Sequence, residues 1–146
     1  MLPYCLVFLL ALLAARPAQA QNTVANYAFG RPGTASYEHF SFWTKDGQRY
    51  TMQYSYGADR RDATLRYAGP ATVGGQPSFK VQFANGRVLY LTPSGTQLRV
   101  ATSPTAAPKA FTWEYEGPVN GVGTACSVCT PNAAAAMQLV RAHYLK

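Results

Sequence analysis

Charged side chains are scarce in this sequence of 146 residues: Asp, Glu, Lys and Arg together make up 13%, whereas apolar residues make up 48%. A disordered charged tail and a coiled coil would both need far more charge, so we expect neither. The mature part of the chain also lacks any apolar run close to the roughly 20 residues that cross a bilayer as a helix. The sequence therefore predicts one folded domain without a transmembrane segment.

Acids and histidines are too few and too scattered for the common catalytic sites. The sequence has six acids and two histidines, and it contains no Gly-x-Ser-x-Gly elbow, His-Glu-x-x-His helix or glycine-rich phosphate loop. Glycoside hydrolysis needs two facing carboxylates, but Glu114 and Glu116 alternate with the aromatic residues of their strand and point away from them. Glu38 and His39 are neighbours on a strand and face opposite ways. We therefore predict that the protein is not an enzyme.

Metal and cofactor sites are not predicted either. Zinc would need two ligands besides a cysteine pair, and the only histidines, His39 and His143, are each isolated in the sequence. An isolated histidine is more often exposed, or satisfied within a core, than bound to zinc.

Cysteine is scarce as well, with three residues in the whole sequence. Cys5 precedes an apolar leader, which leaves Cys126 and Cys129 as a closely spaced pair. In an exported protein such a pair most often forms a disulfide, and we predict one that shapes the loop before the C-terminal helix. The alternatives are a thiol-disulfide redox pair, or a metal site. Haem attachment is excluded because Thr130, and not a histidine, follows Cys129.

An export leader explains the apolar run over 6–15. The run has the length of a signal-peptide core, and the Ala-Gln-Ala at 18–20 is the small-x-small pattern that signal peptidases recognise. We predict that residues 1–20 are removed by cleavage after Ala20 and that the protein is secreted or periplasmic. Arg16 is the only charged residue of the leader, so the mature chain would carry 12 basic and six acidic residues, a net charge of +6.

The positive charge favours an anionic partner, such as an anionic polysaccharide, lipid headgroups or an acidic exported protein; the alternative is a surface charged for solubility alone. Nucleic acid is not predicted, because the basic residues are scattered. Only Arg60 and Arg61 are adjacent, and Asp59 and Asp62 flank them.

Alternating apolar and polar residues predict seven short strands, at 37–44, 48–56, 63–68, 77–83, 87–91, 96–101 and 111–116. Asp46-Gly47 and Asn85-Gly86 are hairpin signals, and Gly69-Pro70 is expected to end the third strand. Residues 21–35 show little periodicity and are expected to form an irregular arm. The short connections predict a single antiparallel domain over 36–146, mainly β and either a barrel or a sandwich.

The C-terminal segment has a helical period. Thr130 is a suitable N-cap, and Pro131 suits the first helical position. Apolar residues then recur at helical spacing, which predicts an amphipathic α-helix over 131–145 that docks against the sheet or plugs an open end.

Aromatic residues gather on the first predicted hairpin. A two-residue turn at Asp46-Gly47 would place Trp43 opposite Tyr50, with Phe40 and Phe42 on the other face. Such surfaces stack on sugars, small apolar ligands or protein loops, and the alternative is that the rings fill the core. With one residue added from the last strand, the candidate binding residues are Tyr37, Trp43, Tyr50, Tyr54, Tyr56 and Trp113.

A second candidate surface is the glycine-rich loop 116–124, which the cysteine pair would hold in shape. The run Phe42-Trp43-Thr44-Lys45 in a small exported all-strand chain resembles the periplasmic inhibitors of C-type lysozyme. The order of the segments differs, and Ser94-Gly95 does not match the Ser-Gly recognition loop of that family. The sequence thus predicts an exported, non-catalytic binding module of unknown specificity, with a thiol-disulfide protein and a secreted enzyme inhibitor as alternatives.

Overall fold

The computed structural model describes residues 23–43, 51–115 and 128–146. The predicted leader, the turn at Asp46-Gly47, Tyr50, the glycine-rich loop and Cys126 lie outside the described residues. The side chains of Trp43 and Cys129 are also outside the description, although the backbone of each belongs to a strand.

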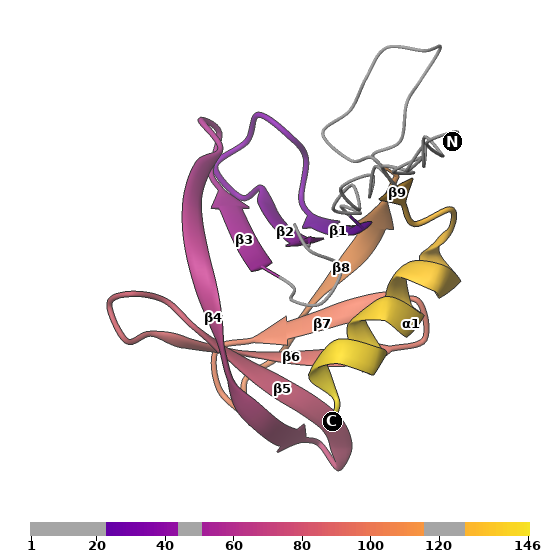
Figure 1. Ribbon diagram of the computed structural model, residues 1–146. Helices are drawn as coiled ribbons and strands as arrows, with labels where there is room; N and C mark the ends of the chain where they lie inside the picture. Colours follow the sequence, from indigo (N-terminus) through magenta and orange to yellow (C-terminus); the bar gives the residue numbers. More distant parts are fainter. Residues whose placement is uncertain (1–22, 44–50, 116–127) are drawn as a thin grey trace, which may run out of the picture.

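Eight antiparallel strands form a closed barrel (Figure 1). Each strand pairs with the next one along the chain, and β1 pairs with both β2 and β8, which closes the ring. The strands are β1 (Thr23–Phe29), β2 (Glu38–Trp43), β3 (Thr51–Tyr56), β4 (Arg61–Val73), β5 (Gln76–Gln82), β6 (Val88–Ser94), β7 (Gln97–Ala101) and β8 (Lys109–Glu114). A short ninth strand, β9 (Val128–Cys129), pairs in parallel with β1. The mainly β fold with a C-terminal helix is confirmed, as a barrel of eight strands instead of about seven.

The first strand was not predicted, because residues 21–35 were expected to form an irregular arm. Instead, Thr23–Phe29 is a strand that lies between β2 and β8. Four consecutive residues of β1, from Ala25 to Ala28, are buried. A strand covered on both faces has no alternation of apolar and polar residues, so the period-2 signal of a half-buried strand is missing.

The register of the first hairpin differs by one residue from the prediction. Phe42 pairs with Met52 and Trp43 pairs with Thr51, whereas a two-residue turn would pair Trp43 with Tyr50. A shift of one residue moves a side chain to the opposite face. Phe42 and Met52 consequently share the inner face of the barrel, and both are buried. The core determines this register, because it needs the apolar residues of both strands on one side.

The fourth strand is longer than predicted and joins two parts of the barrel. It pairs with β3 over 61–65 and with β5 from Arg66 to Val73. Gly69-Pro70 was expected to end the strand, but it produces a register shift between Tyr67 and Pro70 within it. Gly69 has a φ of 105°, a conformation that glycine adopts without strain, so a bulge bends β4 there instead of ending it.

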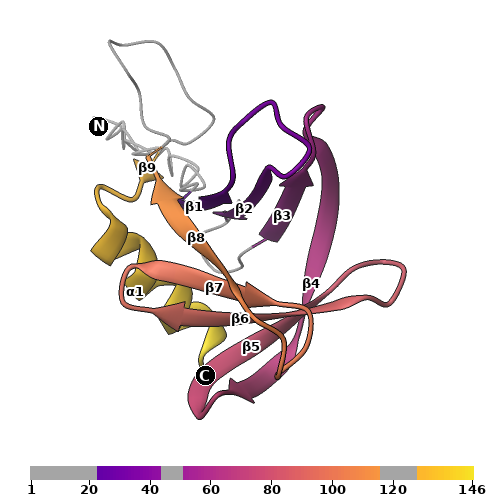
Figure 2. The same ribbon diagram turned by 180° about the vertical axis from the view of Figure 1, so that it is seen from behind.

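The helix α1 (Ala133–Tyr144) closes one end of the barrel. The ring of Tyr144 lies 5.5 Å from that of Phe42 and 4.9 Å from that of Phe79, centroid to centroid. Arg141 donates a hydrogen bond to the carbonyl oxygen of Pro93, near the end of β6. Figures 1 and 2 show α1 and the β3–β4 turn on opposite sides of the molecule.

The helix begins slightly later than predicted. Its N-cap is Asn132, whose side chain accepts a hydrogen bond from the backbone N–H of Ala135 at 2.9 Å, and not Thr130. Asn132 is therefore the residue that satisfies a free N–H at the helix start. Within the described part of the chain, no helix has the length and apolar character that a membrane span requires.

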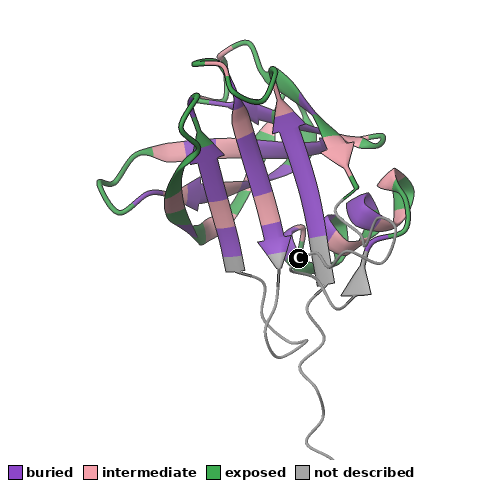
Figure 3. Cartoon of the chain, turned by 90° about the horizontal axis from the view of Figure 1, so that it is seen from above, coloured by how far each residue is buried: buried purple, intermediate pink, exposed green. Residues whose placement is uncertain are grey.

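The middle of the barrel is filled by side chains, as Figure 3 shows by the buried residues along its strands. Phe40 is fully buried, and its ring lies 4.9 Å from that of Tyr54 and 5.3 Å from that of Phe111. An eight-stranded barrel is just wide enough for such filling. A ligand would therefore bind at an end of the barrel and not at its centre.

Candidate ligand site at the open end of the barrel

The barrel end away from α1 is the open end. Inward-facing residues from four strands meet there: Phe29 at the end of β1, Glu38 at the start of β2, Tyr56 at the end of β3 and Lys109 at the start of β8. None of the described helical residues covers this end. The β3–β4 turn and the β5–β6 hairpin lie on this side of the molecule (Figures 1 and 2).

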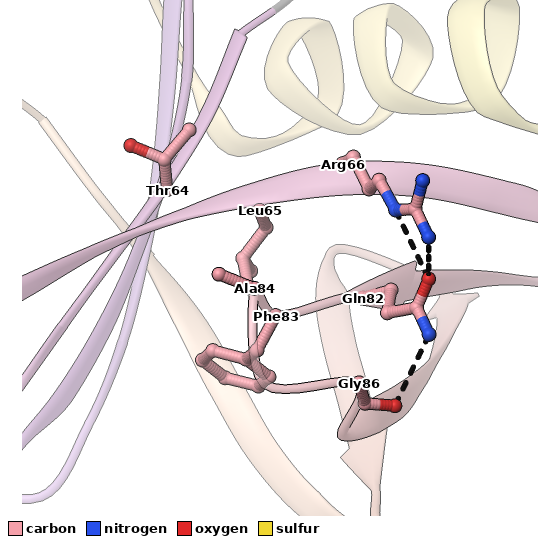
Figure 4. Close-up of a pocket in the computed structure, with 7 residues that line it drawn as sticks. All are labelled: Thr64, Leu65, Arg66, Gln82, Phe83, Ala84 and Gly86. Carbon is pink, nitrogen blue, oxygen red and sulfur yellow. Dashed lines mark hydrogen bonds between the residues drawn. The ribbon is translucent and has the colours of Figure 1, made fainter.

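A pocket of about 480 Å³ opens at this end, and we call it the inner pocket. Its lining residues are Tyr54, Tyr56, Ala63, Thr64, Phe83, Ala84, Asn85 and Arg87. A second hollow of about 530 Å³, which we call the outer hollow, lies against the other side of the same gap between β4 and the β5–β6 hairpin (Figure 4). Its lining residues are Thr64, Leu65, Arg66, Gln82, Phe83, Ala84 and Gly86.

Three aromatic rings form the wall of the inner pocket. Tyr54 and Tyr56 lie on the same face of β3 and stack at 5.6 Å between ring centroids. The ring of Phe83 meets Tyr54 edge to face at 5.5 Å. Tyr54 is buried, whereas 37% of Tyr56 is exposed, so Tyr56 is the ring that a ligand can reach.

Two arginines lie over these rings. The guanidinium carbon of Arg87 is 4.2 Å from the ring centroid of Phe83, and that of Arg61 is 5.2 Å from the ring centroid of Tyr56. Neither arginine forms an ion pair with any described residue. A guanidinium that lies over a ring can still donate its N–H groups to an anion.

Glu38, the acid on the inner face at the open end, is neutralised by its neighbours. Glu38 accepts a hydrogen bond of 2.7 Å from the hydroxyl of Tyr54 and forms an ion pair with Lys109. Burial, reinforced by this bond to Glu38, raises the pKa of Tyr54 above its usual range, so its hydroxyl stays a donor. No carboxylate lines the inner pocket itself.

Hydrogen bonds hold the outer hollow in shape (Figure 4). Arg66 donates from Nε and Nη2 to Oε1 of Gln82, and Gln82 donates from Nε2 to the carbonyl oxygen of Gly86 at 3.1 Å. This chain of bonds joins β4 to the hairpin and places a cation beside the gap.

A row of polar residues on the outer face of β2, β3 and β4 does not form a catalytic triad. His39 pairs across the sheet with Ser55, and Ser55 pairs with Asp62. The hydroxyl of Ser55 donates to Oδ1 of Asp62 at 2.5 Å, while Nε2 of His39 is buried without a hydrogen-bond partner in the described part of the chain. In a triad the histidine stands between the hydroxyl and the acid and activates the hydroxyl. Here the serine stands in the middle.

Burial lowers the pKa of His39 to about 4, and the nearby Arg60 adds to this effect. The ring of His39 is stacked on that of Tyr37, with 6.3 Å between their centroids. Arg60 lies 5.7 Å from the Tyr37 ring. Tyr37, a predicted binding residue, is therefore buried in this outer-face packing, away from the inner pocket.

The structure divides the predicted binding residues. Tyr54 and Tyr56 meet in the inner pocket. Trp113 faces inward near the other end, where its indole N–H donates to the hydroxyl of Thr130 at 3.3 Å, so it does not join them. The Trp43 side chain and Tyr50 are outside the description.

The sequence reasoning missed Phe83, Arg87 and Arg61. The Asn85-Gly86 hairpin signal was the only available pointer to the first two, because a two-residue turn there would pair Ala84 with Arg87 and bring Phe83 close to it. The hairpin is present, but its loop is one residue longer: Phe83 donates its backbone N–H to the carbonyl oxygen of Arg87 at 2.9 Å, and Gln82 pairs with Val88.

Cys129 lies in β9, three residues before the N-cap of α1, and its backbone pairs with that of Val24. No group of three His, Cys, Asp or Glu side chains that could hold a metal ion occurs among the described residues.

No protein-family model, curated protein or solved structure matches this chain.

Proposed function

We propose that the mature chain is an exported, non-catalytic binding module that takes an anionic partner at the open end of its barrel. The observation that carries this proposal is the inner pocket: aromatic walls, Arg87 in its lining, Arg61 beside it, and no lining carboxylate. A concave, mostly apolar site with a few convergent polar groups is the usual form of a binding site.

The charge of the site favours a carboxylate or another flat anion. Arg87 is exposed, and its guanidinium lies over the ring of Phe83. A guanidinium binds a carboxylate through two parallel hydrogen bonds, which gives both affinity and orientation. The mature net charge of +6 would also speed the approach of an acidic partner.

The described residues offer no arrangement for catalysis at this end. Glu38 is held by Tyr54 and Lys109, and it has no second acid beside it. The pocket residues therefore suit recognition better than proton transfer.

Export and the disulfide belong to the same proposal. Cleavage after Ala20 would leave Gln21 at the N-terminus, and a Cys126–Cys129 bridge would add about 1 to 3 kcal/mol by restricting a very small loop. Mass spectrometry of the secreted protein tests both, since the bridge removes two hydrogens from the reduced mass. A bridge that glutathione reduces readily would favour the redox alternative.

Binding is tested by NMR titration of ¹⁵N-labelled residues 21–146 with two anionic probes, a uronic acid tetramer and a capped acidic hexapeptide. We expect at least one probe to shift the amide signals of Tyr56, Phe83 and Arg87. Arg87→Gln should weaken that binding about tenfold or more, because a hydrogen bond to a charged group contributes about 1.5–3 kcal/mol.

Arg99→Gln is the matched control, because Arg99 is exposed on β7 and its loss changes the net charge equally. It should change the affinity less than Arg87→Gln does. The proposal is refuted if neither probe shifts the pocket signals, or if both variants weaken binding to the same extent.

A further inference from the structure

We infer that the partner is an extended acidic peptide that adds a short strand to the free edge of β4. The inference rests on the proposed function and names the partner class of the same site. Its evidence is the strand pairing around the gap between β4 and the β5–β6 hairpin, which is independent of the lining of the inner pocket.

The first half of β4 has a strand on one side only. Residues 61–65 pair with β3, and pairing with β5 begins at Arg66 opposite Gln82. Beyond Gln82 the chain turns into the β5–β6 hairpin, which projects away from β4 (Figure 1). No described strand pairs with residues 61–65 on that side.

The alternation of the ladder shows which backbone groups face the gap. Phe83 donates its N–H to Arg87, within the β5–β6 hairpin. In an antiparallel strand successive residues direct their N–H and C=O groups to opposite sides, so Gln82 directs its own toward β4, where it is the partner of Arg66. By the same alternation Thr64 and Asp62, two and four residues before Arg66, direct their backbone groups into the gap.

The gap is hollowed on both sides of this edge. Thr64, Phe83 and Ala84 line both the inner pocket and the outer hollow. The side chains of an added strand would alternate between the two hollows, because successive side chains point to opposite faces. One hollow holds Arg87 and the other holds Arg66, and no acid lines either.

These features select a peptide over a saccharide. An edge of N–H and C=O groups at strand spacing is matched by another peptide backbone, and strand addition is a known mode of peptide recognition. Acidic side chains that alternate with apolar ones lie on one face of the peptide, where they complement the arginine of the hollow that this face meets. A sugar chain would satisfy the arginines but would leave the edge of Thr64 and Asp62 unpaired.

The test uses the capped peptide acetyl-Val-Glu-Val-Glu-Val-Glu-amide and two methylated versions of it. One version carries methyl groups on the backbone nitrogens of the Val residues, and the other on those of the Glu residues. Methylation removes the backbone donor on one edge of the peptide only. We expect one version to bind residues 21–146 about tenfold or more weakly than the parent, and the other to bind nearly as well. Amide exchange of Thr64 should slow in the complex with the parent peptide.

Two variants of β4 sharpen the test. Thr64→Pro removes the N–H that faces the gap, at an edge position where proline is tolerated, and should abolish peptide binding. Thr64→Val keeps the N–H and the branched shape and should retain it. Circular dichroism checks that both variants fold. If Thr64→Pro does not fold, the methylated peptides still test strand addition on the unchanged protein.

The inference fails if both methylated peptides bind as well as the parent, or if Thr64 exchange is unchanged in the complex. If the uronic acid tetramer still binds with dependence on Arg87, the proposed function survives that failure. Concentration-dependent dimers whose formation slows Thr64 exchange would also overturn the inference, because a second copy would then cover the edge.

Discussion

His39 makes the stability of this protein depend on pH in a way that one substitution should remove. The side chain is 3% exposed and is stacked on Tyr37, and Nε2 has no hydrogen-bond partner in the described part of the chain. Arg60 disfavours its charged form and Asp62 favours it, but burial is the largest effect. His39→Phe keeps a ring against Tyr37 and removes the titrating group.

The magnitude follows from the two pKa values. The pKa of His39 is about 4 in the folded protein and 6.5 without the fold. Between these values the unfolded chain binds more protons, so stability is fully present above pH 6.5 and falls as the pH falls toward 4. The total loss is about 3 kcal/mol, of which about 2 kcal/mol is reached by pH 5.

Urea unfolding at pH 7, 6 and 5 measures the effect, because the carboxylates titrate alike in both proteins. Between pH 7 and pH 5 the wild type should lose about 2 kcal/mol more than His39→Phe. His143→Asn is the control: this histidine is exposed on α1, and its removal should change the pH dependence much less. Parallel losses in the wild type and His39→Phe would refute the reasoning, because His39 would then accept a proton inside the fold.

Three further substitutions, with a fourth as a control, test local structure by the same unfolding assay. Asn132→Ala removes the N-cap of α1 and should lower the free energy of unfolding by about 1 kcal/mol; no change would mean that the cap bond is absent. Tyr54→Phe removes the hydroxyl that donates to Glu38 and should lower the free energy of unfolding by about 1–3 kcal/mol. An equally stable variant would contradict the hydrogen bond between Tyr54 and Glu38. Gly30→Ala brings a new Cβ within 2.8 Å of the carbonyl oxygen six residues later, whereas Gly33→Ala, at nearly the same φ of 80°, meets nothing within 4 Å. Gly30→Ala should therefore be clearly the more destabilising of the two, and equal losses would contradict the close approach.

Local signals were enough for seven of the eight barrel strands, β2 to β8, and for one turn. Alternation predicts β5, where Phe79 and Val81 face inward and are fully buried. The Asn85-Gly86 signal predicts the next hairpin, and the structure shows its turn: Gly86 has a φ of 87° and donates its N–H to the carbonyl oxygen of Phe83. These features depend on residues close together in the sequence, so a single sequence contains them.

Features that depend on ring closure could not be predicted in the same way. β1 completes the barrel between β2 and β8, and its burial on both faces removes the alternation that would identify it. The register of β2 and β3 depends on which side the core needs Phe42 and Met52. A turn signal at Asp46-Gly47 specifies a hairpin but cannot by itself outweigh that packing.

Two inward-facing charges, Glu38 and Lys109, identify the open end of the barrel. Glu38 precedes Phe40 and Phe42 on the inner face of β2, and Lys109 precedes Phe111 on the inner face of β8. A charge at an inward position is costly unless it is paired or reaches water, and these two pair with each other at the end that α1 does not cover. In sequence they are 71 residues apart, so only the closed barrel shows that they meet. A charge at the inward end of an otherwise apolar strand therefore marks the uncovered end of a small barrel, which is where binding residues can gather.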